Sequence, residues 1–245
     1  VNVWKADGTA LPGFPVFTQG ADPGTPAVGD IDGDQIPEIV VVDYNSPKVE
    51  AWHTNGIPVN NFPVDTSVPL PPGHTYYWTT PTLANLDADP ALEIIAPSQS
   101  GIVHILNGDG TNLPGWPKTL DSNIQSSAAA GDIDSDGLPE ILIRQFNKLY
   151  AFNPDGTNVP GWALARANPG KFSPVLGGIE RETGLDLLTA ESTGAGGVVA
   201  AINASGITIF STSLSTSISF GAIAVGDLDL NGNLEIFVSD NTGKI

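Results

Sequence analysis

The chain has 245 residues, 40% of them hydrophobic, which suffices for one large domain with a substantial core or for two small ones. Its 27 acidic residues outnumber 9 basic ones and give a net charge of −18. This charge argues against nucleic acid or an anionic membrane as a partner, because both attract basic patches. No apolar run approaches the roughly 20 residues of a membrane-spanning helix, so no membrane insertion is expected.

Short apolar runs separated by turn residues predict β-strands along the chain. The first unit is expected to have strands at residues 26–29, 39–42 and 49–52, with a short fourth strand near residues 62–64. The 28 glycines and 21 prolines are spread between such runs and indicate turns. No stretch shows the sustained 3.6-residue periodicity of an amphipathic helix. The expected fold class is therefore all-β.

An acidic nine-residue motif follows the first strand of this unit and recurs along the chain. It reads DIDGDQIPE at residues 30–38, DIDSDGLPE at 132–140 and DLDLNGNLE at 227–235. Two weaker copies start at Asn85 and Gly178, so consecutive motifs begin 46 to 55 residues apart. Oxygen-bearing side chains at positions 1, 3, 5 and 9, with the carbonyl of position 7, match the preference of Ca²⁺ for six to eight oxygen ligands.

The predicted calcium ligands follow from these positions. In the first loop they are Asp30, Asp32, Asp34, the carbonyl of Ile36, and Glu38. In the third loop they are Asp132, Asp134, Asp136, the carbonyl of Leu138, and Glu140, and in the fifth Asp227, Asp229, Asn231, the carbonyl of Asn233, and Glu235. The second loop offers Asn85, Asp87, Asp89, the carbonyl of Ala91, and Glu93, but has Pro90 where the turn favours glycine. The fourth keeps only Glu180, Glu182 and Asp186, and no site is expected there.

The residues after each loop distinguish these motifs from an EF-hand. In an EF-hand the last acidic ligand opens a helix. Here Glu38 and Glu140 run directly into the β-branched and apolar stretches IVVV and ILI, which are typical of strands. A helix-loop-helix calcium site is therefore excluded.

A second motif gives each repeat a turn and then a Pro-Gly-aromatic segment. Copies lie at residues 7–15, 109–117 and 155–162, with a looser one at 55–63. Four short strands in each unit of about 48 residues are typical of β-propeller blades, with a β-solenoid as the structural alternative. We expect one propeller domain over residues 1–245, with five blades at 1–20 plus 221–245, 21–66, 79–122, 123–168 and 169–215.

The repeated Asp-x-Asp-x-Asp-Gly-x-x-Glu loop between two strands resembles the FG-GAP/VCBS family, which includes the propeller of integrin α-subunits. The resemblance covers the whole chain. It implies a calcium-binding propeller of a surface or secreted protein. Family members commonly have seven blades, whereas five are expected here, so the chain is either a small closed ring or one part of a longer array.

The two ends of the chain are cut at matching positions of the repeat. Strands at residues 223–226 and 236–238 come last, and residues 1–4 are what should follow them. Pairing of these segments within one molecule would complete the fifth blade. The same pairing between molecules would link subunits head to tail, into a filament.

Other candidate residues are few. Residues His74, Tyr76, Tyr77 and Trp78, in the longest interblade segment, are the candidate contact for a glycan or a protein, although their rings are equally expected to pack over the end of the blades. Trp116 and Trp162 are expected to pack between blades, and His53 and His104 to occupy matching positions on a strand face. No nucleophile elbow, phosphate loop or zinc-spaced histidine set is recognised, so no catalytic activity is expected.

The motifs favour a non-enzymatic, extracellular or cell-surface protein that Ca²⁺ stabilises. Extracellular modules bind calcium with dissociation constants of about 10⁻⁴ to 10⁻³ M, so such loops fill outside the cell. The expected role is adhesion, scaffolding or assembly, with a protein, a glycan or further copies of the chain as partner. A lectin-like module and the non-catalytic domain of a polysaccharide-active enzyme are the alternatives.

Overall fold

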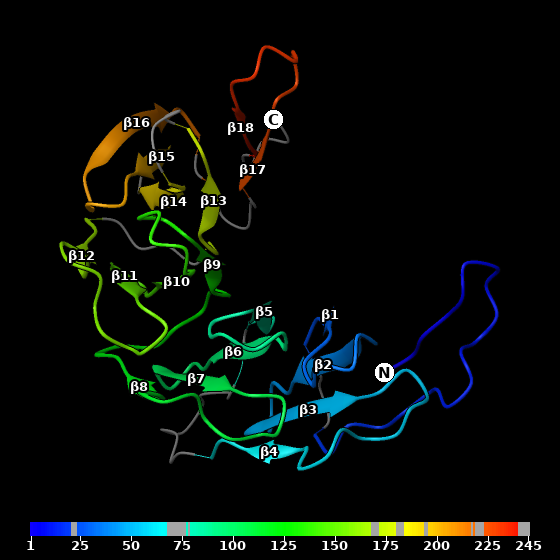
Figure 1. Cartoon of the computed structure of the whole chain (residues 1–245). Coiled ribbons are helices and arrows are strands. Elements are labelled where there is room, and N and C mark those ends of the chain that lie inside the picture. Colours follow the sequence, from blue (N-terminus) through cyan, green and yellow to red (C-terminus); the bar gives the residue numbers. More distant parts are fainter. Residues whose placement is uncertain are drawn as a thin grey trace. The chain divides into compact units, whose positions relative to one another are not determined.

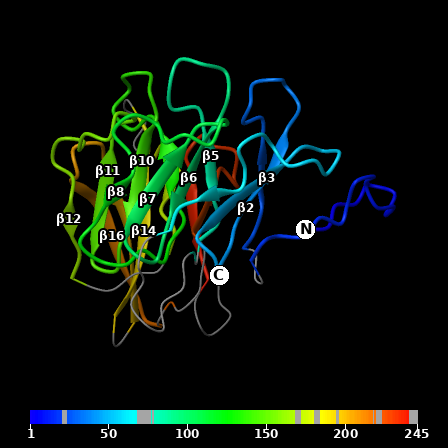
Figure 2. The same ribbon diagram turned by 90° about the horizontal axis from the view of Figure 1, so that it is seen from below.

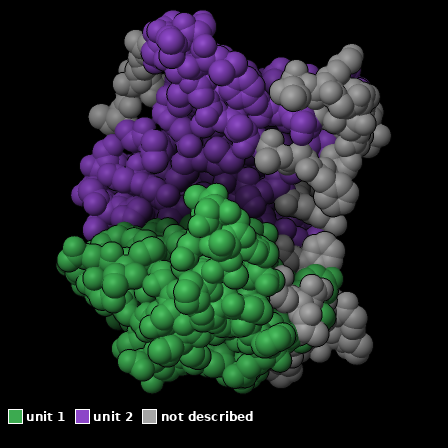
Figure 3. All heavy atoms as spheres, turned by 90° about the vertical axis from the view of Figure 1, so that its right-hand side faces the viewer, with its two compact units in different colours: residues 1–124 green, residues 125–245 purple. Residues whose placement is uncertain are grey.

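The computed structural model describes residues 1–20, 24–67, 77, 79–167, 172–179, 184–193, 196–216, 218 and 223–239. They belong to two compact units, residues 1–124 and 125–245 (Figure 3). The regular structure of the described residues consists of β-strands, as expected from the sequence. No helix long and apolar enough to cross a bilayer is found among them.

Unit 1 contains two antiparallel sheets of four strands, each in sequence order (Figure 1). The first consists of β1 (Ala27–Gly29), β2 (Glu38–Val42), β3 (Lys48–Trp52) and β4 (Val64–Asp65). The second consists of β5 (Thr82–Ala84), β6 (Glu93–Pro97), β7 (Ile102–Leu106) and β8 (Lys118–Thr119).

Unit 2 repeats this arrangement. Its first sheet consists of β9 (Ala129–Gly131), β10 (Glu140–Arg144), β11 (Lys148–Phe152) and β12 (Leu164–Ala165). The next consists of β13 (Val175–Gly177), β14 (Asp186–Thr193), β15 (Gly196–Ile202) and β16 (Thr208–Leu214), and β17 (Ile223–Gly226) pairs with β18 (Glu235–Val238). Four four-stranded sheets and one two-stranded sheet therefore make up the described structure.

The second strands of the four-stranded sheets are buried on both faces. All five residues of β2, β6 and β10 are buried, which requires cover on both faces of the strand. Strands that are buried on both faces have near-continuous apolar sequences, as these strands do. In unit 1 one core cluster joins Val40 and Val49 of the first sheet to Ile94 of the second. Within unit 1 the first sheet thus buries a face against the second, and in unit 2 a cluster that contains Leu142 and Leu187 joins the two four-stranded sheets in the same way.

Glycines at the end of the first strand allow this close packing. A Cβ built on Gly131 would lie 2.7 Å from Cδ1 of Leu176 and 2.9 Å from Cδ1 of Leu185, both from the following repeat. Gly29 meets Leu92 and Leu83 in the same way in unit 1. The absence of a side chain at these positions therefore lets the neighbouring leucines approach the strand.

Residues 1–16 form a hairpin that projects from the side of unit 1 that carries β1–β4 (Figures 1 and 2). Its bridge between Trp4 and Ala10 matches the bridge between Trp52 and Pro58 in the first sheet. The hairpin thus has the pattern of the third strand of a blade and the turn that follows it. The predicted pairing of this segment with β17 and β18 is not among the strand pairs of the described residues, and it stays a prediction.

Candidate metal centre

The acidic loops lie where the sequence predicts them, between the first and second strands of the sheets. The residue at position 9 has the same contact in all five: one carboxylate oxygen accepts a hydrogen bond from the backbone N–H of position 2. The donor–acceptor pairs are Ile31–Glu38 at 3.1 Å, Leu86–Glu93 at 2.5 Å, Ile133–Glu140 at 2.8 Å, Ile179–Asp186 at 2.9 Å and Leu228–Glu235 at 2.8 Å. This contact ties the loop to the start of the second strand.

Two backbone positions distinguish the complete loops from the second one. Positions 4 and 6 have positive φ in all three complete loops, at Gly33 and Gln35, Ser135 and Gly137, and Leu230 and Gly232. At position 6 the φ values are 69°, 93° and 85°. Proline fixes φ near −65°, so Pro90 excludes this conformation from the second loop. The structure thus gives a physical reason for the departure seen in the sequence.

The third loop is the most complete candidate. Oxygens of Asp132, Asp134 and Asp136 lie within 4.8 Å of one another. Glu140 is fully buried, and its Oε1 has no hydrogen-bond partner among the described residues, nor does Oδ1 of Asp132. A buried carboxylate oxygen without a partner is costly. A hard cation that accepts oxygen ligands would satisfy both atoms, so the donor set fits Ca²⁺.

Burial raises the pKa of the position-9 glutamates above the ordinary 4.5. For Glu38, Glu93 and Glu140 desolvation is the main cause, and the N–H donated by position 2 opposes it. The neighbouring aspartates of the same loop raise the pKa further. Several carboxylates therefore destabilise one another in the loop, and a bound cation would offset that repulsion.

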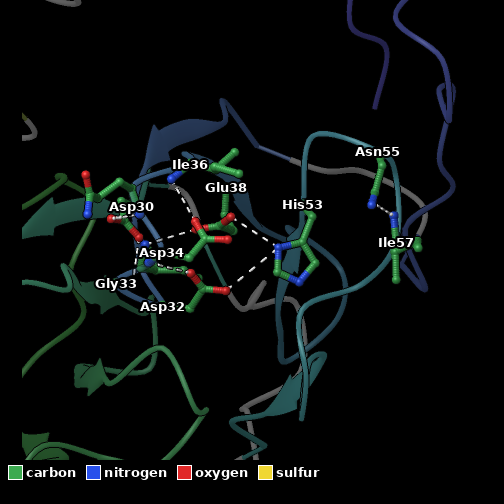
Figure 4. Close-up of polar contacts among 11 residues, drawn as sticks. Asp30, Asp32, Gly33, Asp34, Ile36, Glu38, His53, Asn55 and Ile57 are labelled. Carbon is green, nitrogen blue, oxygen red and sulfur yellow. Dashed lines mark hydrogen bonds and ion pairs between the residues drawn. The ribbon is translucent and has the colours of Figure 1, made fainter.

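A histidine from outside the first loop lies against its carboxylates, although the loop motif does not include it. Asp30, Asp32 and Asp34 form one group within 4.8 Å, and Asp32, Glu38 and His53 form another. His53 follows β3, and its Nδ1 lies 3.2 Å from Oε1 of Glu38 and 3.8 Å from Oδ2 of Asp32 (Figure 4). The ring points toward the two carboxylates, so it belongs to the candidate centre.

The remaining loops are less complete. In the second, Asp87, Asp89 and Glu93 come together, while the amide of Asn85 donates to the carbonyl of Asp89 at 2.5 Å. In the fifth, Asp227, Asp229 and Glu235 come together. In the fourth, Asp186 is buried at position 9, and Glu180 and Glu182 lie outside the described residues. The predicted carbonyl ligands Ile36, Ala91, Leu138 and Asn233 stay predictions.

Two other expectations need correction. His53 and His104 do not occupy matching positions, because His104 lies inside β7, whereas His53 follows β3. His104 is 8% exposed and its Nδ1 lies 3.3 Å from Oδ1 of Asn112, so it belongs to the interior. The prediction that Tyr77 contacts a glycan or a protein is also wrong, because its side chain is buried. Tyr77 is 2% exposed, and its hydroxyl lies 2.6 Å from Oγ1 of Thr66. Burial raises its pKa.

The other residues of that candidate contact, His74, Tyr76 and Trp78, lie outside the described part of the chain.

The expectation that Trp162 packs between repeats is confirmed. It is buried in a cluster with Ile202, and its Nε1 donates to the carbonyl of Ala204 at 2.7 Å. Trp116 is likewise buried, at 7% exposure.

Comparisons with known proteins identify the fold. No protein-family model matches the chain, and no curated protein sequence matches it. BBS1N, solved in complex with ARL6DN, is similar with a TM-score of 0.59 and 14% identity over 91% of this chain and 65% of that one. The computationally designed Ika8 protein gives a TM-score of 0.62 and 9% identity over 97% and 64%. The V. cholerae biofilm matrix protein Bap1 gives 0.45 and 15% over 83% and 42%.

The chain spans less than two thirds of the length of each of these structures. At identities this low the similarity is informative about the fold and not about activity. Together with the four four-stranded antiparallel sheets, it shows an all-β fold of the β-propeller type.

Proposed function

We propose that this protein is an extracellular β-propeller that calcium stabilises and that acts, without enzymatic activity, as an adhesion, scaffold or assembly module. The observation that carries the proposal is the third loop. Among the described residues, Oε1 of the fully buried Glu140 and Oδ1 of Asp132 lack hydrogen-bond partners, and Asp132 lies in one group with Asp134 and Asp136. A cation in this loop would remove both the repulsion and the unsatisfied oxygens.

The expected affinity supports an extracellular location. Loops of this kind bind calcium with dissociation constants of about 10⁻⁴ to 10⁻³ M, which suits extracellular and not cytosolic calcium levels. The resemblance of the loops to the FG-GAP/VCBS family supports the same compartment. A stiff, metal-braced set of blades is then the functional unit that presents a surface to a protein or glycan.

Thermal unfolding in calcium and in EDTA tests the stabilising role. A ligand that binds only the folded state stabilises it by RT ln(1 + [L]/Kd), and several sites act together. We expect the midpoint to rise with calcium concentration and to rise less with magnesium at equal concentration, because Mg²⁺ demands a regular octahedral site. A midpoint that is the same in 10 mM calcium and in EDTA contradicts the proposal.

The N-terminal hairpin favours assembly as a second candidate function. Trp4 is 63% exposed, whereas the equivalent Trp52, Leu106 and Phe152 are at most 5% exposed. Trp52 lies opposite Ile39 of β2, the residue after Glu38, in the strand pairing. The corresponding residue in β18 is Ile236, which follows Glu235. Pairing of Trp4 with Ile236 of the same chain or of another copy would bury the exposed indole.

A cross-linking experiment distinguishes these two arrangements. The chain has no cysteine, so Trp4→Cys with Ile236→Cys introduces the only two thiols. Directly opposed residues of antiparallel strands lie about 4.5 to 5.5 Å apart, within reach of a disulfide. Oxidation to a cross-linked monomer indicates closure within the chain, and a ladder of multimers indicates head-to-tail assembly. Free thiols after oxidation contradict the pairing in both forms.

A further inference from the structure

The group formed by Asp32, Glu38 and His53 differs chemically from the other candidate centres. Its three ligand atoms lie within 4.8 Å of one another. Glu38 is fully buried at the base of the group, whereas the side chains of Asp32 and His53 are each 28% exposed. An imidazole nitrogen therefore stands beside two carboxylates at the edge of the loop (Figure 4).

The spacing of these atoms suits a small divalent ion. A tetrahedral zinc ion with ligands at about 2.0 to 2.1 Å places neighbouring ligand atoms about 3.3 Å apart. Nδ1 of His53 lies 3.2 Å from Oε1 of Glu38 and 3.8 Å from Oδ2 of Asp32. Ca²⁺ takes oxygen ligands, whereas imidazole suits zinc, copper, nickel and iron. The donor set therefore favours a transition metal.

The equivalent residues of the other repeats make His53 the distinguishing feature. The residue after the third strand is Asn107 in the second repeat, Asn153 in the third and Asn203 in the fourth. In the third repeat, Asn153 donates to Oγ1 of Thr157 at 2.9 Å, and Oε1 of Glu140 has no partner in the described part of the chain. In the first repeat, His53 lies against the matching oxygen of Glu38. One substitution within a common framework thus adds a nitrogen ligand to a loop that otherwise offers oxygens.

A cavity gives access to this group. It has a volume of about 520 Å³, lies within unit 1, and is lined by Asp32 and His53 together with Asp87, Asp89 and Asn107. Three protein ligands leave a fourth position of a tetrahedral ion free for water, as in zinc sites that are open to solvent. The cavity is large enough for that water and for a small polar ligand that would replace it.

We propose that the first loop binds a transition-metal dication of the zinc class through Oδ2 of Asp32, Oε1 of Glu38 and Nδ1 of His53, with its open position facing the cavity. The inference rests on the proposed role of the loops as cation sites and assigns a different ion to one of them. The third and fifth loops, which lack a histidine, keep the oxygen-only chemistry of calcium.

Zinc titration of the protein in excess calcium tests the proposal. Calorimetry gives the affinity and stoichiometry, and the imidazole ¹⁵N signals show which histidine binds. His53→Asn is the matched variant, because asparagine is the residue that the other repeats have at this position and should leave the fold intact. His74→Asn is the control for loss of a histidine elsewhere in the chain.

We expect one zinc site in the wild type, a shift of the His53 Nδ1 signal on zinc binding, and an affinity at least about 100-fold weaker in His53→Asn. Loss of an outer-shell partner alone costs 10- to 100-fold in metal affinity, and loss of a direct ligand should cost no less. Unchanged zinc affinity in His53→Asn overturns the proposal, as does a His53 signal that zinc does not move.

The calcium-induced rise of the unfolding midpoint is measured on the wild type and on His53→Asn. This rise depends on the third and fifth loops and should persist in His53→Asn. If the expected effect of His53→Asn on zinc binding is absent while the calcium-induced rise remains, the inference about His53 is wrong and the proposed calcium role stands. If the rise is absent in the wild type, the calcium role itself fails.

Discussion

Replacement of Glu140 by glutamine separates the metal-binding role of this residue from its structural role. Gln is isosteric, and its amide oxygen can still accept the N–H of Ile133 that Oε2 of Glu140 accepts at 2.8 Å. The substitution removes the charge from a fully buried group whose pKa is raised by burial and by the charges of Asp132, Asp134 and Asp136. Without metal, Glu140→Gln should therefore be at least as stable as the wild type at neutral pH, because a buried charge repelled by its neighbours is lost.

With calcium the order should reverse. A site with a dissociation constant of about 10⁻⁴ to 10⁻³ M contributes about 1.4 to 2.7 kcal/mol at 10 mM calcium. If loss of the charged ligand weakens binding about tenfold, as loss of an outer-shell partner alone can do, the variant loses about 1 kcal/mol of this stabilisation. That loss corresponds to a midpoint shift of about 2 to 4 °C for a cooperative unit of 150 to 250 residues.

Differential scanning calorimetry in EDTA and at increasing calcium measures both the stability of the metal-free protein and the stabilisation that calcium adds. Glu50→Gln is the matched control, since Glu50 is a buried glutamate outside the acidic loops and should leave the calcium-induced shift unchanged. The reasoning is refuted if Glu140→Gln shows the full calcium-induced shift of the wild type. It is also refuted if the variant is strongly destabilised in EDTA, which would mean that the charge stabilises the metal-free fold.

Three further predictions concern the framework around the loops. Burial raises the pKa of Glu50 above 4.5, so its contribution to stability is fully present below that pH and is lost as the pH rises. In urea unfolding with EDTA, the wild type should therefore lose stability relative to Glu50→Gln between pH 4.5 and 7.5. A stability difference that stays constant over this range would contradict the prediction. Glu191→Gln should lower the free energy of unfolding by about 3 kcal/mol, because it removes the charged carboxylate that lies 3.5 Å from the buried Arg144 guanidinium. A loss below about 1 kcal/mol would show that this ion pair contributes little to stability. Gly131→Ala should cost about 1 kcal/mol through contact with the leucines of the next repeat. Gly178→Ala should be close to neutral, because its added Cβ meets no described atom within 4 Å, and equal effects of the two substitutions in chemical denaturation would exclude the packing argument.

The strands and loops could be predicted because their signals are local. Each acidic loop stands between a short first strand and an apolar second strand, and the β-branched run after Glu38 excludes a helix at that point. The effect of Pro90 could also be anticipated, since the backbone requirement of a turn is local to the sequence. Position 6 of the loop has positive φ in the other copies, which proline cannot adopt.

The role of His53 could not be seen from the loop motif, because it comes from the hairpin that follows. His53 is 15 residues beyond Glu38, and the pairing of β2 with β3 brings the two together. Alignment of the residue after the third strand would have shown a histidine among asparagines. The burial of Tyr77 also depends on a contact across the chain, with Thr66, which no local pattern encodes.

Crystals grown in calcium test the central claim most directly, through anomalous difference density. We expect a calcium peak in the third loop, about 2.3 to 2.6 Å from carboxylate oxygens of Asp132, Asp134, Asp136 and Glu140, with a further peak in the fifth loop. Contact of the ion with Oε1 of Glu140 would explain why that buried oxygen has no partner among the residues that the structure describes. Well-ordered loops without such peaks at millimolar calcium would contradict the claim that calcium stabilises this propeller.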